Sequence, residues 1–392
     1  MESRVELKTG WMMNRLGKSK INWKNYERSM GAVITVILVA LLFHYWSNEA
    51  FLTSRNLSNL SRQICVNLTL AVGMTLVILT SGIDLSVGSV LALSGMVSAL
   101  TQVSLHWANL GPYGAVLSFL CALAVGGLCG GITGFSIAKL KITPFIVTLG
   151  MMVICRGMTL IISGAQAVAP LGESLGALSS DYLSPFVSLI LLSTTLVATV
   201  GYYAVGFIKG RVLPDVAFKN AGAVALLSGL GIYVFCGYRG IPYMVLISLL
   251  CAAVGIFVLK YTRYGRFLYA IGGNREAAEL SGVPVAKALW LTYFLMGILA
   301  GLAGVMDSAR VNGSVPSAGE LSELDAIAAV VIGGTSLMGG VGTIAGTVFG
   351  VLVMGILNNG MSLVGISEHY QKVFKGVVIV VAVYLDLRSK KK

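Results

Sequence analysis

Runs of about twenty apolar residues recur along almost the whole chain, separated by short polar interruptions. An α-helix of about twenty residues crosses the roughly 30 Å hydrocarbon core of a bilayer. Only 11% of the 392 residues are charged, whereas about 25% are charged in soluble proteins. The sequence therefore predicts an all-α integral membrane protein, a polytopic helical bundle that crosses the bilayer many times.

The apolar runs define about twelve transmembrane helices, some of them short or broken. One candidate span, 323–337, is short and rich in glycine, and it fits a full span or a broken, re-entrant helix equally well. The candidate spans lie near 30–48, 63–81, 84–103, 113–138, 143–164, 184–208, 220–237, 242–260, 287–306, 323–337, 341–360 and 371–387.

The distribution of basic residues predicts the orientation of these spans. If the N-terminus is cytoplasmic, the inside segments hold 21 Lys and Arg residues and the outer loops hold four. Cytoplasmic loops are enriched in Lys and Arg, so both termini are expected to be cytoplasmic. Residues 1–29 would then form a cytoplasmic segment, 30–387 a single transmembrane domain with a cytoplasmic loop at 261–286, and 388–392 a basic tail. The net charge of +12 follows from this topology, and no nucleic-acid partner is expected.

The first polar interruption is Ser81–Ser89, with the sequence SGIDLSVGS. A carboxylate inside a span costs about 2.5–3.5 kcal/mol on insertion scales, so Asp84 needs a partner or water. Asp84 and Ser86 are candidates for the lining of a polar pathway. The alternative is a turn in which Asp84 caps the following helix, and the two interpretations are compatible.

The second interruption is Thr143–Gly150, in which Pro144 suits the first position of a helix. Thr148 is a further candidate for the pathway. Arg156 lies roughly 18 Å along this helix from Pro144, at about 1.5 Å per residue. It is expected to face a cavity or a carboxylate such as Asp84 or Asp325. Arg156 then either contacts substrate or forms a structural pair between helices.

Three acidic residues enter the apolar run that follows Pro316. Glu320 and Glu323 fit a solvated helix start, where acids favour the helix dipole. Asp325 lies deeper and is a candidate for the pathway. In the next span, Asn358 and Asn359 add uncharged polar groups, which suit an uncharged polyol.

The predicted loop 261–286 carries the motif Gly272–Val283. Asn274 can cap a short helix that runs through Leu280 and ends at Ser281–Gly282. A short helix with small residues on one face suits docking into the groove of a partner, and a solvated loop helix is the alternative. The candidate docking residues are Gly272, Gly273, Asn274, Glu276, Ala277, Ala278, Leu280, Ser281 and Gly282.

Motifs for several other functions are absent from the sequence. No phosphate loop of the form GxxxxGK(S/T) and no HExxH is present, and the three His residues are well separated. The chain is therefore expected to be neither an enzyme nor a metal protein. A transporter coupled to protons or sodium, with Asp84, Arg156 and Asp325 as its relay, is the rival hypothesis.

Four long motifs, in order, resemble the permease subunits of bacterial ABC sugar importers. They are GIDLSVGS, TPFIVTLG with the nearby CRG, YAIGGN-EAA-LSG with variable positions dashed, and PSAG followed by ELDAIAAVVIGGTSLMGGVG. The resemblance covers about residues 51–386. The extra pair of spans near 184–237 is similar to the D-xylose permeases.

This resemblance implies a set of partners and a location. The permease would be half of a homodimer in the bacterial plasma (inner) membrane. A periplasmic or lipid-anchored binding protein would deliver a monosaccharide, with D-xylose expected. A separate ATPase subunit would use ATP and Mg²⁺, so no cofactor is expected on this chain. Gly272–Val283 resembles the loop that meets the ATPase, and substituting Glu276 or Gly273 is expected to abolish uptake.

Overall fold

The computed structural model describes residues 36–209 and 214–390, and this part of the chain is helical with two isolated β-bridges. The predicted cytoplasmic segment 1–29 lies outside the described residues, as do the last two residues of the predicted tail 388–392. The start of that tail continues the last helix, which runs through Lys390.

Each predicted span overlaps a helix of the structure. The long helices are Val36–Trp46, α3 (Ser54–Leu79), α4 (Val87–Val103), α5 (Pro112–Ala138), α6 (Pro144–Ser163), α8 (Pro185–Ile208), α9 (Pro214–Gly231), α10 (Tyr243–Tyr261), α13 (Val285–Val311), α14 (Ser322–Ile332), α15 (Ile344–Leu363) and α16 (Glu368–Lys390). Shorter elements are η1 (Trp107–Leu110), α7 (Glu173–Ser180), η2 (Ile232–Cys236), α11 (Arg263–Gly273) and α12 (Arg275–Leu280).

Seven helices of the described part are long and apolar enough to cross a membrane. They are α3, α5, α6, α8, α10, α13 and α15. This number supports the predicted polytopic helical bundle. The count of twelve crossings and the cytoplasmic position of both termini remain predictions.

Close packing of α5 against α13 depends on glycine. A Cβ on Gly126 would collide with the carbonyl oxygen of Gly297, and a Cβ on Gly297 would collide with that of Gly126. Small residues allow helices to approach when no hydrophobic force acts between them in lipid. Together with the buried helix α3, α13 forms the centre of the bundle, around Met74, Tyr293 and Met296.

The segment predicted as either a full span or a broken helix proves to be broken. Helix α14 has 11 residues, so it extends about 16 Å and covers roughly half of a bilayer core. Residues 333–343 are not helical, and the chain becomes helical again at Ile344. This irregular backbone lies against other parts of the protein, where a membrane protein tolerates it.

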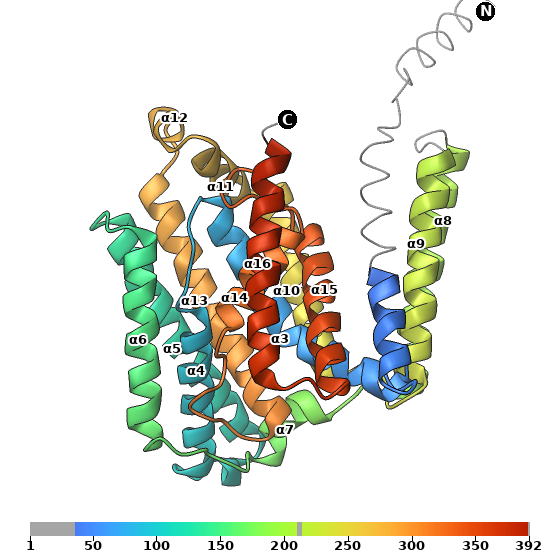
Figure 1. Cartoon of the computed structure of the whole chain (residues 1–392), viewed down its shortest axis with the longest axis horizontal. Coiled ribbons are helices and arrows are strands. Elements are labelled where there is room, and N and C mark those ends of the chain that lie inside the picture. Colours follow the sequence, from blue (N-terminus) through green and yellow to red (C-terminus); the bar gives the residue numbers. More distant parts are fainter. Residues whose placement is uncertain (1–35, 210–213, 391–392) are drawn as a thin grey trace, which may run out of the picture.

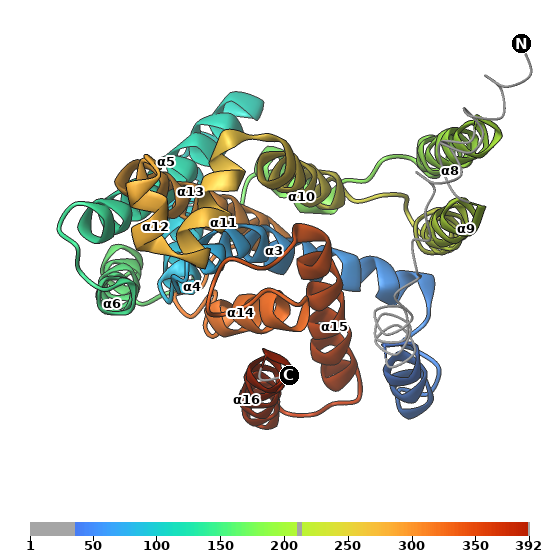
Figure 2. The same ribbon diagram turned by 90° about the horizontal axis from the view of Figure 1, so that it is seen from above.

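Helices α8 and α9 form a hairpin to one side of the bundle (Figure 2). At its base, the Leu183 N–H donates a 2.9 Å hydrogen bond to the Ile241 carbonyl. The side chains of Ser54 and Tyr233 connect η2 to the start of α3, with hydrogen bonds of 3.1 and 3.2 Å to the Tyr233 and Leu52 carbonyls. Among the described residues, these contacts attach the hairpin to the bundle near one of its ends.

Helices α11 and α12 project from one end of the bundle, and the C-terminal end of α16 lies at the same end (Figure 1). We call this the α12 end. The connection 80–86 leaves the end of α3 here and descends to the start of α4 within the bundle (Figure 1).

Candidate functional site

Asp84 and Ser86 form a local pair in the connection between α3 and α4. Asp84 Oδ1 accepts hydrogen bonds from the Ser86 backbone N–H over 2.8 Å and from Ser86 Oγ over 2.6 Å. Both residues are buried. The cap position of α4 is Ser86, not Asp84, so the alternative that made Asp84 the helix cap is wrong. The carboxylate instead stabilises the turn that precedes α4.

Thr148 joins α6 to this connection. Pro144 begins α6 as predicted, and this places Thr148 one turn into the helix. Its hydroxyl is buried and donates to the carbonyl oxygens of Phe145 at 3.3 Å and Ile83 at 3.5 Å. The structure therefore brings Thr148 and the Asp84–Ser86 turn together.

Arg156 lies further along α6 and contacts backbone rather than a carboxylate. Its Nη1 donates to the carbonyl oxygens of Pro316 and Ala318 over 2.6 and 2.9 Å. Arg156 was expected to face either a cavity or a carboxylate such as Asp84 or Asp325. Among the described residues it forms no ion pair with either carboxylate, but it does line a cavity of about 500 Å³. Its guanidinium attaches α6 to the segment before α14.

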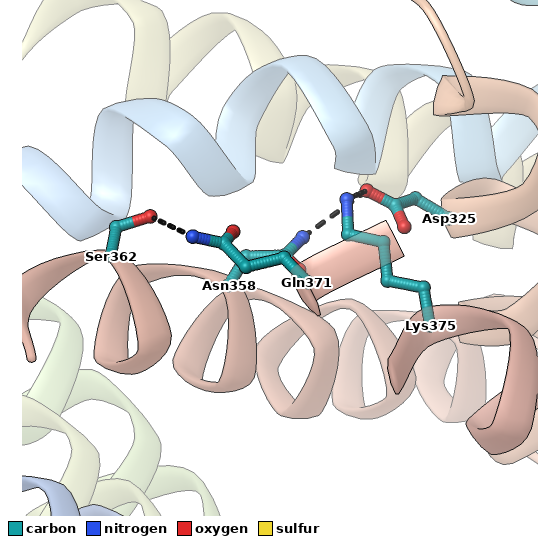
Figure 3. A network of polar contacts seen from close by, with 5 residues as sticks. All are labelled: Asp325, Asn358, Ser362, Gln371 and Lys375. Atoms are coloured by element: carbon teal, nitrogen blue, oxygen red, sulfur yellow. Dashed lines mark hydrogen bonds and ion pairs between the residues drawn. The ribbon is translucent and has the colours of Figure 1, made fainter. Parts of the chain in front are cut away.

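Asp325 is the centre of a polar network between α14, α15 and α16 (Figure 3). Its Oδ2 accepts from Lys375 Nζ over 2.8 Å and from Asn358 Nδ2 over 3.1 Å. The side chains of Asp325 and Lys375 are only 7% and 18% exposed. Nearby, Gln371 Nε2 donates to Ser362 Oγ over 3.3 Å. A buried charge needs such a partner in a low-dielectric environment.

Asn359 points away from that network, although Asn358 is its neighbour in sequence. Asn359 and Asn56 exchange two amide hydrogen bonds, of 2.9 and 3.3 Å, which join α15 to the first turn of α3. Asn359 is buried, and its hydrogen bonds are used within the protein. This geometry favours a packing role for Asn359 over the pathway role expected for both residues.

The rival hypothesis of a proton or sodium relay involves Asp84, Arg156 and Asp325, and these residues belong to three separate hydrogen-bond networks. Asp84 is bonded to Ser86, Arg156 to two carbonyls, and Asp325 to Lys375 and Asn358. No ion pair connects them in the described ranges. Among the residues that the structure describes, no group of three His, Cys, Asp or Glu side chains is close enough together to hold a metal ion.

Helices α6 and α16 flank α4 and α14 on one side of the bundle (Figures 1 and 2). Two cavities open there, of about 500 and 490 Å³, and Glu320 and Leu321 line both. The larger one contains Arg156 and Glu323. The other is lined by polar residues that include Gln63, Asn67, Asp307, Arg310, Gln371, Lys372 and Lys375.

Lys372 and Lys375 lie at the start of the predicted span 371–387, and the sequence pointed to no role for either. Lys372 forms an exposed ion pair with Glu320 over 2.9 Å, and this hydrogen bond lowers the pKa of the Glu320 carboxyl. Lys375 forms the buried pair with Asp325. A polar stripe runs along one face of α16 at its start, formed by Glu368, Gln371, Lys372 and Lys375. This spacing is the signal that could have identified both lysines.

The predicted loop helix is present as α12 and has the predicted ends. Asn274 Oδ1 caps it by accepting from the Ala277 N–H over 2.9 Å, and Ser281 and Gly282 end it, with Gly282 at a φ of 81°. Ala278 is buried, whereas Glu276 and Ala277 are exposed. Leu280 is 90% exposed, and burial of a leucine side chain against a partner is favourable by about 1.5–3 kcal/mol.

The base of α12 rests on a contact between three chain segments, which we call the glycine joint: Leu79, Ser81, Gly272, Gly339 and Gly340. Ser81 Oγ donates to the Met338 carbonyl over 2.7 Å, and Gly340 N–H donates to the Leu79 carbonyl over 3.0 Å. A Cβ on Gly272 would collide with the Leu79 carbonyl oxygen and the Gly340 nitrogen.

The glycine joint connects α12 with the two irregular segments of the bundle. The C-terminal end of α11 touches both the end of α3 and the segment 333–343. The Tyr269 hydroxyl of α11 adds a 2.8 Å hydrogen bond to the Gly342 carbonyl. The glycine joint thus places the base of α12 in contact with the connection that carries Asp84 and with the segment between α14 and α15.

The geometry describes a polytopic helical membrane protein with polar groups inside the bundle and a helix presented at one end. A family model, "branched-chain amino acid transport system / permease component", matches residues 56–383. The chain belongs to this permease family.

Proteins of known function are similar to the chain over nearly its whole length. The xylose transport system permease protein of Escherichia coli is 37% identical over 376 residues, 94% of each chain. The ribose import permease proteins of Escherichia coli and Bacillus subtilis are each 38% identical, over 94% and 92% of this chain and 95% and 92% of their own lengths. No solved structure matches the chain. These relatives are transport permeases rather than enzymes.

Proposed function

We propose that this protein is the permease subunit of an ABC importer that moves a monosaccharide inward across the bacterial plasma membrane. A separate ATPase subunit would supply the energy from ATP and Mg²⁺, and a periplasmic or lipid-anchored binding protein would deliver the sugar. D-Xylose is our first candidate substrate, because a xylose permease is similar over 94% of both chains. The ribose permeases are comparably similar, so the closely related pentose D-ribose is the second.

The observation that carries this proposal is α12 with its support. The short helix projects beyond the bundle (Figure 1), and Leu280 on it is 90% exposed. A partner groove that covers Leu280 would remove its apolar surface from water. The glycine joint then offers a mechanical route from the partner to the interior of the bundle. In this proposal the α12 end faces the cytoplasm, both termini lie on that side, and the chain crosses the membrane twelve times.

The sugar path is proposed along the side of the bundle that α6 and α16 flank. Its lining would include polar groups of the two cavities, such as Gln63, Asn67 and Gln371, with Arg156 and the Asp325–Lys375 pair as fixed supports. Neutral polyols are bound by amides and paired charges. A second copy of the chain would close the path from the opposite side. Asp84, Ser86 and Thr148 would border it where the connection between α3 and α4 moves.

Reconstitution tests this function. The purified permease would be combined in proteoliposomes with the ATPase subunit and with candidate binding proteins, each loaded with D-xylose, D-ribose or D-galactose. We expect ATP hydrolysis to rise several-fold with one loaded binding protein and sugar to accumulate inside the proteoliposomes. Sugar uptake that needs no ATPase and collapses with an uncoupler would instead support the ion-coupled rival.

Replacement of Leu280 tests the docking role of α12. Leu280→Asp is expected to weaken ATPase binding by roughly thirtyfold, because a buried apolar anchor at an interface contributes about 2 kcal/mol or more. Leu280→Met, which keeps the apolar character, is the matched control and should bind almost normally. Affinity would be measured by surface binding of the purified ATPase to the permease in nanodiscs. Equal binding by the two variants would exclude Leu280 from the interface.

A further inference from the structure

A groove between α5 and α13 lies on the bundle surface, away from the side that α6 and α16 flank. Its volume is about 800 Å³, and its lining is almost entirely apolar. Gly127 and Gly131 form the floor, and Leu128, Phe135, Trp290 and Phe294 form the walls. The rings of Trp290 and Phe294 stack with their centroids 5.1 Å apart and 11° between their planes. A groove of this composition suits an extended hydrocarbon chain.

Some glycines of α5 face the α13 backbone and others face the groove, and the two sets have different functions. Gly126 and Gly130 face the α13 backbone, where an added Cβ would collide with the carbonyl oxygens of Gly297 and Tyr293. Gly131 faces the groove instead, and a Cβ there would meet only the Phe294 ring at 3.6 Å. Helix packing therefore does not explain Gly131. Its lack of a side chain keeps the groove open.

Basic residues stand at one end of this groove. Lys139 follows α5 directly, and Lys287 lies on α13 three residues before Trp290, which places both on the stripes that line the groove. Ala138 packs in one buried cluster with Val285 and Ala288, so the two lysines are brought to the same place. Lys139 and Lys287 are exposed, and neither forms an ion pair within the part of the chain that the structure describes.

We propose that this groove is a binding site for an anionic phospholipid. Lys139 and Lys287, with Lys141 nearby in sequence, would bind the phosphate, and one acyl chain would lie over Gly127 and Gly131 against Phe135, Trp290 and Phe294. Basic pockets between transmembrane helices bind anionic headgroups by the same combination of charge and apolar surface. The two lysines, which form no ion pair among the described residues, and the apolar groove are complementary to the two ends of such a lipid, the anionic phosphate and the acyl chain.

Quenching of Trp290 fluorescence tests this proposal in the full chain. The other four tryptophans would be replaced by phenylalanine, and the protein would be placed in vesicles containing phospholipids with brominated acyl chains. We expect brominated phosphatidylglycerol to bind roughly 25-fold more tightly than brominated phosphatidylcholine, since Lys139 and Lys287 near the headgroup each contribute roughly fivefold. In a Lys139→Ala/Lys287→Ala variant this preference should disappear, and Gly131→Leu should reduce quenching by both lipids.

Two control variants and a second measurement keep the test decisive. Lys209→Ala removes a charge at the end of α8, and Gly201→Leu adds a side chain where a Cβ meets nothing within 4 Å; both should leave quenching unchanged. Native mass spectrometry of the protein with all its tryptophans should show retained phosphatidylglycerol that the double lysine variant loses.

Three outcomes would overturn the lipid site. Equal quenching by the two headgroups would exclude charge recognition. Weak quenching by both lipids would mean that another copy of the protein covers the groove. Competition by soluble glycerol phosphate would mean that the lysines bind a free phosphate instead.

Discussion

Gly272→Ala is expected to lower sugar uptake at least tenfold while the protein still inserts into the membrane. The added Cβ would collide with the Leu79 carbonyl oxygen and the Gly340 nitrogen, and both are backbone atoms that cannot rotate away. Separating the segments would break the 3.0 Å hydrogen bond from Gly340 to Leu79, and an unsatisfied buried group costs about 1–3 kcal/mol. In the proposed mechanism, motion of α12 would then no longer reach the interior of the bundle.

The matched control for this prediction is Gly273→Ala. Gly273 is exposed, and a Cβ there meets no atom within 4 Å, so uptake should stay within about twofold of the unsubstituted protein. The sequence-based prediction was that substituting Gly273 abolishes uptake. The open space around Gly273 and the close contacts of Gly272 lead us to expect the large loss at Gly272 instead. Uptake would be measured in cells that also express the ATPase and the binding protein, with the amount of permease in the membrane determined by immunoblot. Normal uptake by Gly272→Ala would disprove transmission through the glycine joint.

Lys375→Met is expected to destabilise the protein by about 3–5 kcal/mol, because it leaves the Asp325 carboxylate buried without its counter-charge. In the described part of the chain, Asp325 Oδ1 already has no hydrogen-bond partner, and Oδ2 would keep Asn358 alone. The free energy of unfolding would be measured with denaturant in detergent micelles. Removing the charge on both sides, in Asp325→Asn/Lys375→Met, should restore much of the lost stability.

Lys372→Met is the matched control on the same helix. The Lys372–Glu320 pair has the same short separation, 2.9 Å, but its side chains are 44% and 55% exposed. Exposed ion pairs contribute about 0–1 kcal/mol, so Lys372→Met should change stability little. If the two lysine variants were equally stable, the Asp325–Lys375 pair would not be buried as the structure places it.

The local elements of the fold were predictable from the sequence. Hydropathy located each long helix, because an apolar run of sufficient length is a property of neighbouring residues. Turn and cap chemistry located the ends of α12 at Asn274 and Gly282, since an Asn side chain and a left-handed glycine act within a few residues. Composition alone could not determine whether 323–337 crosses the bilayer, because a broken helix and a full span are equally apolar.

The partners of the polar side chains were decided only by the tertiary structure. Arg156 was expected to face a cavity or a carboxylate; it lines a cavity, and its hydrogen-bond partners are the carbonyls of Pro316 and Ala318 in the segment before α14. Lys375 meets Asp325, which is fifty positions away in the chain. Asn358 and Asn359 project about 100° apart around one helix and serve different networks.

The sequence by itself thus determined that the protein is a polytopic membrane protein built of helices and that a short helix lies between Asn274 and Gly282. The tertiary structure decided how these helices meet. The physical reason is that burial of apolar length depends on each segment alone, whereas a buried charge or a glycine contact depends on which distant backbone arrives beside it. The glycine joint, made by three segments far apart in the sequence, is the clearest case.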